Sequence, residues 1–179
     1  MNEWDQQFGL VHDCLRACVY GDFLAREKIQ NGAWPSIRDM CYADAVISWN
    51  SVFGGYNNET HWKKFVSKIS IPKEDKLKPF DQQMIIGYLG ITDQEWEKFH
   101  KIMGDVRNTR IAHLNVKQNL HELPNITWAM HSCYLYREWL IQALHLGNRL
   151  GYKIKIADQT TKQVVNEFKS QIKSAYTGL

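Results

Sequence analysis

Four polar residues near the middle of the chain have types and spacing suited to chemistry on a phosphate. Arg107, Asn108, Arg110 and His113 lie within one short stretch. When the 2′-hydroxyl of RNA attacks the adjacent phosphate, a catalyst must move a proton near pH 7 and stabilise the charge that develops on phosphorus. Histidine has the pKa for the first task, and arginine presents a fork of donors to phosphate oxygens for the second. This stretch contains both residue types.

The stretch continues a helix that is predicted to be apolar on one side. Arginine is almost never fully buried without a partner, so arginines on the apolar side predict a polar cleft or a subunit interface. At 100° per residue, one arc of this helix holds Trp96, Phe99, His100, Met103, Val106, Arg107, Arg110, His113 and Leu114, and the opposite arc holds Glu97, Lys98, Lys101, Asp105, Thr109 and Ala112.

The spacing of Arg107 and His113 limits how they act together. On a continuous α-helix, six residues correspond to roughly 9 Å of rise and an offset of about 120°, too far for both side chains to grip one phosphate. Either the helix breaks near Asn108, or two copies of the motif meet across a twofold axis.

The sequence Arg107-Asn108 followed by four residues and His113 resembles the signature of the HEPN superfamily, a group of small all-helical proteins. That signature is an arginine, commonly followed by a polar residue, with a histidine four to six positions beyond the arginine. The resemblance implies a metal-independent ribonuclease whose site is composed across a homodimer. It also implies a role in toxin–antitoxin or anti-phage defence systems, with a nucleotidyltransferase-type antitoxin as one candidate partner.

The resemblance also implies roles for individual residues. His113 would be the general acid and base, Arg107 the phosphate clamp, and Asn108 the residue that orients one of them. Arg110 lies one helical turn from both Arg107 and His113, so we expect it to bind substrate phosphate as well. The competing interpretation is structural: the arginines pair with acids such as Asp44 or Glu59, and His113 only caps the helix end.

A second polar cluster occupies residues 57–62, between two glycines and a predicted helix start at Thr60. Glu59 and His61 are candidates to support the same site. The alternative is a turn rich in asparagine followed by a helix cap. The remaining histidines show neither the His-Glu-x-x-His spacing nor a Cys/His quartet, so we expect no metal site and no cofactor.

Hydrophobic spacing predicts helices through most of the chain, and hence an all-α, HEPN-like bundle of about five to seven helices in a single domain over residues 1–179. The motif helix has the best-marked start, with Thr92 and Glu95 as a capping box and Ile91 and Trp96 as a hydrophobic staple. Residues 70–80 contain two prolines and many charges, which predicts an exposed connection. The other predicted helices cover about 3–30, 34–53, 61–69, 81–89, 126–150 and 160–176.

Composition narrows the class of protein. A net charge of +3 permits an RNA partner without requiring one. The four cysteines form no paired Cys-x-x-Cys motifs and are expected to be reduced and mostly buried.

We find no signal peptide and no stretch that is long and uncharged enough for a membrane span, so we expect a cytoplasmic protein. Two functions remain: an endoribonuclease, or a non-catalytic HEPN-like module that binds RNA, a nucleotide or a protein.

Overall fold

A computed structural model describes residues 2–27, 32–72, 75–111, 124–149 and 159–177. Within these ranges the protein is all-α and contains no strand, which confirms the predicted fold class. None of the helices described is long and apolar enough to cross a membrane. The elements are α1 (Glu3–Arg26), α2 (Trp34–Phe53), α3 (Trp62–Val66), α4 (Gln82–Leu89), α5 (Asp93–Val106), a π-helical turn η1 (Arg107–Ile111), α6 (Ile126–Arg149) and α7 (Thr161–Thr177).

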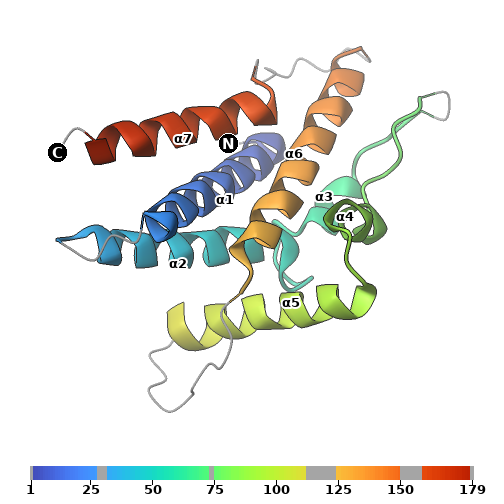
Figure 1. Cartoon of the computed structure of the whole chain (residues 1–179). Coiled ribbons are helices and arrows are strands. Elements are labelled where there is room, and N and C mark those ends of the chain that lie inside the picture. Colours follow the sequence, from blue (N-terminus) through green and yellow to red (C-terminus); the bar gives the residue numbers. More distant parts are fainter. Residues whose placement is uncertain (1, 28–31, 73–74, 112–123, 150–158, 178–179) are drawn as a thin grey trace.

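The helices α7, α1, α2 and α5 follow one another in a stack, and α6 runs across it (Figure 1). Helices α1 and α2 lie side by side along most of their lengths, and α6 packs against both. The short helix α4 packs on α6, whereas α5 and η1 pack on α2. The motif helix therefore lies at one edge of the bundle, where its C-terminal end meets α2.

Local signals place most helix ends where the sequence predicts them. Asn2 forms a capping box with Asp5 at the start of α1, and Pro35 occupies the first turn of α2. Gly90 ends α4 at a φ of 66°, in the left-handed region that favours glycine. The structure differs at α3, which begins one residue later than predicted: the imidazole of His61 is the N-cap, and Thr60 is not.

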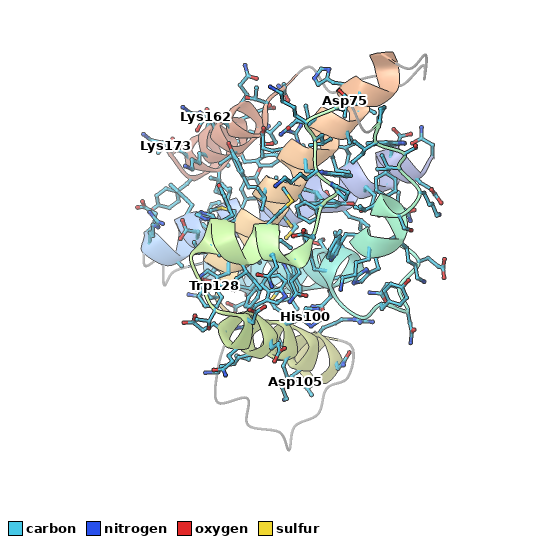
Figure 2. All side chains as sticks on the ribbon, turned by 90° about the vertical axis from the view of Figure 1, so that its right-hand side faces the viewer. Asp75, His100, Asp105, Trp128, Lys162 and Lys173 are labelled. Carbon is cyan, nitrogen blue, oxygen red and sulfur yellow. The ribbon has the colours of Figure 1, made fainter. Side chains whose placement is uncertain are left out.

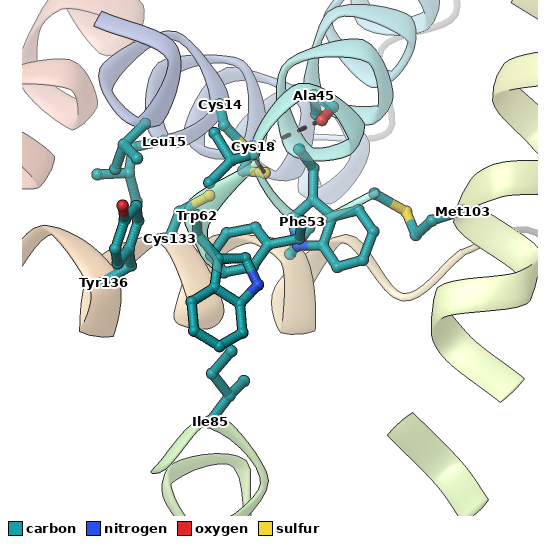
Figure 3. Packing of buried hydrophobic residues seen from close by; sticks show 14 of the residues in the cluster. Cys14, Leu15, Cys18, Ala45, Phe53, Trp62, Ile85, Met103, Cys133 and Tyr136 are labelled. Carbon is teal, nitrogen blue, oxygen red and sulfur yellow. Dashed lines mark hydrogen bonds between the residues drawn. The ribbon is translucent and has the colours of Figure 1, made fainter. Parts of the chain in front are cut away.

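The core is unusually aromatic, and it also contains three thiols. Trp49 stacks on Phe53, with ring centroids 5.4 Å apart, and Tyr136 stacks on Trp139. The sulfur atoms of Cys14 and Cys18 lie 3.9 Å apart; Figure 3 shows them beside Cys133 in the buried cluster. All four cysteines are free, and all but Cys41 are buried, as predicted. Burial raises the pKa of the Cys133 thiol well above its usual value, so this thiol stays protonated.

The connection over residues 70–80 is only partly exposed. Lys76, Lys78 and Pro79 face solvent as predicted, but Phe80 is buried. The Phe80 ring lies 4.8 Å from that of Tyr136, and the indole of Trp139 donates a hydrogen bond of 2.8 Å to the Lys78 carbonyl. The buried Phe80 ring and the hydrogen bond to the Lys78 carbonyl thus attach the end of this segment to α6.

Candidate functional site

Helix α5, which leads into the motif, begins and packs as predicted. The Glu95 N–H donates to the Thr92 hydroxyl at 3.2 Å, and the Thr92 N–H donates to the Glu95 carboxylate at 2.8 Å. The Thr92 N–H and hydroxyl, which both donate to the Glu95 carboxylate at 2.8 Å, hold the pKa of Glu95 below its usual value. The inward arc is buried, and it consists of Trp96, Phe99, Met103 and Val106. The predicted face of the motif helix is therefore confirmed up to Val106.

The α-helix widens into a π-helical turn at the first residue of the motif. Turn η1 covers Arg107–Ile111, and the Thr109 hydroxyl donates to the Asp105 carbonyl at 2.6 Å. Such turns interrupt α-helices mainly as single insertions, and they occur often at functional sites. A break near Asn108 was one of the two arrangements expected from the spacing of Arg107 and His113. The structure shows that helical geometry does change at this point.

Arg107 and Asn108 lie together at the start of this turn. Arg107 is half-buried and Asn108 is exposed, so both reach solvent. Neither of the acids considered as a structural partner binds Arg107 in the described part of the chain: Glu59 pairs with Lys64 at 3.3 Å, and Asp44 accepts a hydrogen bond from Ser48 at 3.4 Å. For Arg107, the ion-pair interpretation with these two acids is therefore wrong.

Two of the candidate residues cannot be placed beside them. His113 lies outside the described residues. Arg110 belongs to the π turn by its backbone, but its side chain also lies outside what the structure describes. The predicted catalytic histidine and the predicted second phosphate ligand thus remain predictions from the sequence.

Two polar contacts fix α5 against α2. The buried amide of Asn50 donates to the carbonyls of Val46 at 2.8 Å and Met103 at 3.0 Å. One turn away, the His100 Nε2 lies 2.6 Å from the Phe53 carbonyl and donates to it. Because the residue numbers rise along α5 as they fall along α2, the helices are antiparallel, in agreement with Figure 1. This register sets the start of η1 beside the turn of α2 around Val46.

The loop between α2 and α3 is held by hydrogen bonds on both sides. The Asn58 amide donates to the Asn50 carbonyl at 2.8 Å, and the Thr60 hydroxyl donates to the Ser51 carbonyl at 2.6 Å. The loop leaves α2 through Gly54, where a Cβ would lie only 2.4 Å from the Asn50 carbonyl oxygen. From α1, buried Gln7 donates to the Thr60 carbonyl at 2.8 Å. The loop is therefore a fixed part of the bundle.

The two supporting candidates in this loop have different surroundings. The Glu59 side chain is 93% exposed and, among the described residues, pairs with Lys64. His61 is 4% exposed and accepts a hydrogen bond of 3.1 Å from the Lys63 N–H at its Nδ1. The interpretation of this segment as a turn and helix cap is thus confirmed in part, because His61 caps α3.

His61 also lines a cavity of about 370 Å³ between this loop and α5, which we call the histidine pocket. Figure 2 shows His100 on the side of α5 that faces the rest of the protein, with Asp105 on the outer side. The pocket contains donors, acceptors and aromatic surface together. Its lining residues are Gly54, Tyr56, His61, Lys63, Gln82, Trp96, Glu97, His100 and Lys101.

The two imidazoles of the pocket differ in the ring atoms that they leave available. Burial, with the nearby charges of Lys63, His100 and Lys64, lowers the pKa of His61 to about 4, so its ring is neutral at pH 7. His100 donates from Nε2 to Phe53, so its Nδ1 carries the lone pair in the neutral ring. His100 can therefore accept a hydrogen bond at Nδ1 in the pocket.

Sequence reasoning missed His100 and the pocket, although one signal was available. His100 falls on the predicted inward arc of α5, where a polar residue among Trp96, Phe99 and Met103 needs a partner. Its partner, the Phe53 carbonyl, is distant in sequence. Among the described residues, no group of three or more His, Cys, Asp or Glu side chains is arranged to hold a metal ion.

Comparisons with known proteins do not assign this chain to a family: no protein-family model matches it, and searches of curated proteins and of solved structures find no similar protein.

Proposed function

We propose that this protein is a metal-independent endoribonuclease of the HEPN type, with a site composed across a homodimer. The observation that carries the proposal is the position of the first two motif residues. Arg107 and Asn108 reach solvent at the start of a π-helical turn, at the end of a helix whose inner face is buried. The anchored half of α5 supplies rigidity, and the widened end supplies exposed polar groups.

The proposed reaction is transesterification within the RNA strand. His113 removes the proton from a 2′-hydroxyl, the 2′-oxygen forms a bond to phosphorus, and the bond from phosphorus to the 5′-oxygen breaks. A protonated imidazole in the composite site returns a proton to the 5′-oxygen. Arg107 stabilises the charge on the phosphate oxygens, Asn108 orients the reacting groups, and Arg110 binds the phosphate. The products carry a 2′,3′-cyclic phosphate and a 5′-hydroxyl.

An exposed apolar stripe on α2 supports the homodimer. Ile37, Met40 and Ile47 recur at helical spacing on α2 and are 36%, 69% and 44% exposed. Helix α2 also packs against η1, so the stripe belongs to the element that contacts the motif. A second copy bound on this stripe would cover apolar surface and bring two motifs toward one axis.

In the cell, the proposed enzyme is a cytoplasmic toxin or anti-phage effector, restrained by an antitoxin of the nucleotidyltransferase type. The rival function is a HEPN-like module that binds RNA, a nucleotide or a protein without cleaving anything. The histidine pocket favours this rival, because it offers polar groups for a ligand and lies apart from the motif.

Cleavage of total RNA in excess EDTA by the wild type and by His113→Ala tests the proposal. We expect the wild type to produce fragments with cyclic phosphate ends, and His113→Ala to lose at least a hundredfold in rate, because general acid–base groups contribute about 10²-fold to 10⁴-fold. His145→Ala, which removes an exposed histidine of α6, serves as the matched control and should cleave normally.

Folding and assembly must be measured on the same samples. Circular dichroism and sedimentation of His113→Ala should match those of the wild type. If the folded, dimeric wild type leaves RNA intact, or if His113→Ala cleaves as fast as the control, the proposed enzyme is wrong and the binding module takes its place.

A further inference from the structure

We infer that the histidine pocket, together with a neighbouring apolar pocket, binds one nucleotide of the RNA strand that the motif cleaves. The inference rests on the proposed function and adds a second binding site to it. The apolar pocket has a volume of about 460 Å³ and lies over α3 and the start of α4. Lys63 and Gln82 line both cavities, so the two adjoin, and together they are called the groove.

The two halves of the groove match the two halves of a nucleotide. The apolar pocket is lined by the largely buried rings of Trp62 and Phe80 and by part-exposed Val66, which form an apolar wall for a base. The histidine pocket offers the ammonium groups of Lys63 and Lys101, together with His100. Such a combination of cationic groups and aromatic surface is how proteins bind single strands without reading their sequence.

The charged groups of the pocket indicate which of them is available to a phosphate. Lys101 pairs with Asp105 at 2.5 Å, and Lys64 pairs with Glu59, so these cations are already neutralised in part. Lys63 lies over the Trp62 ring, 5.4 Å from its centroid, and its side chain is exposed. Lys63 is therefore the principal phosphate ligand, although the carboxylates of Glu97 in the histidine pocket and Asp81 in the apolar pocket oppose it.

Tyr56 supplies a stacking surface at the mouth of the histidine pocket. Its ring is 62% exposed and meets the His61 ring edge to face, with centroids 5.4 Å apart. Lys64 lies 5.6 Å from the ring centroid. An exposed tyrosine fixed by two neighbours can stack on a base at little cost in side-chain entropy.

The groove also lies in register with the motif. His100 and Arg107 are seven residues apart, so they point to the same side of α5 and are separated by about 10 Å along its axis. Met103 and Val106, which lie between them on this side, are buried, so one extended RNA strand that contacts both would pass along the exposed edge of α5 at Lys101. The groove would thus hold a nucleotide that flanks the cleaved phosphate.

The test measures binding of a fluorescent single-stranded 2′-O-methyl RNA, which cannot be cleaved because its 2′-oxygen is blocked. We expect Tyr56→Ala to weaken binding by about fivefold or more. A fivefold loss corresponds to the smallest effect usually found when one stacked base loses its aromatic partner. Lys63→Ala should reduce the slope of log affinity against log salt by about 0.7, the value for one phosphate of a single strand. A merely structural role would leave that slope unchanged.

Matched variants on a remote helix control for general charge effects. Lys162→Ala and Lys173→Ala remove exposed lysines of α7, seen on the far side of the molecule from His100 in Figure 2, and should leave affinity and salt slope unchanged. If Lys63→Ala and these two control variants lose equal amounts of affinity and salt slope, the inference is overturned. So would an oligonucleotide affinity no higher than that for AMP, which would assign the groove to a free nucleotide.

The same variants separate this inference from the proposed enzyme. If RNA is cleaved but Tyr56→Ala and Lys63→Ala change neither affinity nor cleavage, the enzyme stands and the nucleotide groove is wrong. If nothing is cleaved but the groove variants lose affinity as expected, the groove stands as a binding site and the enzyme is wrong.

Discussion

Buried polar side chains join the parts of this protein that surround the candidate site. Asn50 connects α2 to α5, and Gln7 connects α1 both to the Tyr136 hydroxyl at 3.0 Å and to the loop before α3. In the described part of the chain, every buried side-chain nitrogen and oxygen has a hydrogen-bond partner. An unpaired buried polar group costs about 1–3 kcal/mol, so these contacts specify one arrangement of the helices.

His61 should make stability depend on pH. Its pKa is about 4 in the folded protein and 6.5 without burial, so the unfolded chain binds more protons between these values. The contribution of neutral His61 is complete above pH 6.5 and is lost as the pH falls through 4. The loss in free energy of unfolding is at most about 3 kcal/mol. Urea denaturation of the wild type and of His61→Gln between pH 7 and 4 measures it.

The control for this prediction is the exposed His145. His145→Gln should keep the acid sensitivity of the wild type, whereas His61→Gln should lose most of it. Some sensitivity remains in His61→Gln, because burial also lowers the pKa of His12. Parallel pH profiles for the wild type and His61→Gln would contradict the assignment.

At the scale of elements, α5 combines two different tasks. Its first three turns are buried against α2 and the aromatic core, through Trp96, Phe99 and Met103. Its end widens into η1 and exposes Asn108. The capping box at Thr92 fixes the residue at which α5 begins. Helical periodicity from that residue then places Trp96, Phe99 and Met103 on one face.

Removal of the cap should therefore destabilise the element that carries the motif. Thr92→Ala deletes the hydroxyl that accepts from the Glu95 N–H, and we expect a loss of about 1 kcal/mol in free energy of unfolding. Thr92→Ser should restore most of it. Gln94→Ala changes an exposed residue in the same helical turn and should have little effect. Equal stability of Thr92→Ala and Gln94→Ala would show that the cap contributes nothing.

At the scale of the whole molecule, the exposed stripe on α2 is the feature that the described chain leaves uncovered. Ile37, Met40 and Ile47 form it, and α2 is also the helix on which η1 packs. In the proposed homodimer, assembly and catalysis depend on the same surface. A change on the stripe should thus abolish cleavage without touching the motif.

Met40→Lys is the direct test of that dependence. It places a charge where a second copy would bury an apolar side chain, so we expect the dimer dissociation constant to rise at least tenfold and cleavage to fall with it. Sedimentation at micromolar concentration and the RNA assay measure the two effects. Tyr88→Lys alters another exposed hydrophobic residue, on α4, and serves as the control. An intact wild-type monomer that cleaves RNA would contradict the composite site.

Much of the fold could be predicted because its signals are local. The start of α5 depends on Thr92 and Glu95, three residues apart, and the end of α4 depends on Gly90. The inward arc of α5 follows from helical periodicity alone. The π-helical turn at Arg107 was not predicted: the spacing of Arg107 and His113 suggested a break near Asn108 or a second copy of the motif, and the helix instead continues in a wider form.

The candidate site was harder to predict from the sequence, because its residues are distant along the chain. His61 and His100 share a pocket only because Asn50 and Phe53 hold α5 antiparallel to α2. Arg137 of α6 is another residue whose surroundings no local signal predicts. The structure buries it, with its guanidinium donating to the Thr161 hydroxyl at 3.0 Å.

By itself, the sequence determined that this protein is all-helical, where most of its helices begin, and which face of α5 is apolar. Helical hydrogen bonds and caps connect residues within about four positions, so these properties can be read locally. Only the tertiary structure decided that loop 54–61, α4 and α5 enclose one groove. This arrangement depends on contacts such as the hydrogen bond from Gln7 to the Thr60 carbonyl. The two residues are 53 positions apart, so no helical pattern in the sequence relates them.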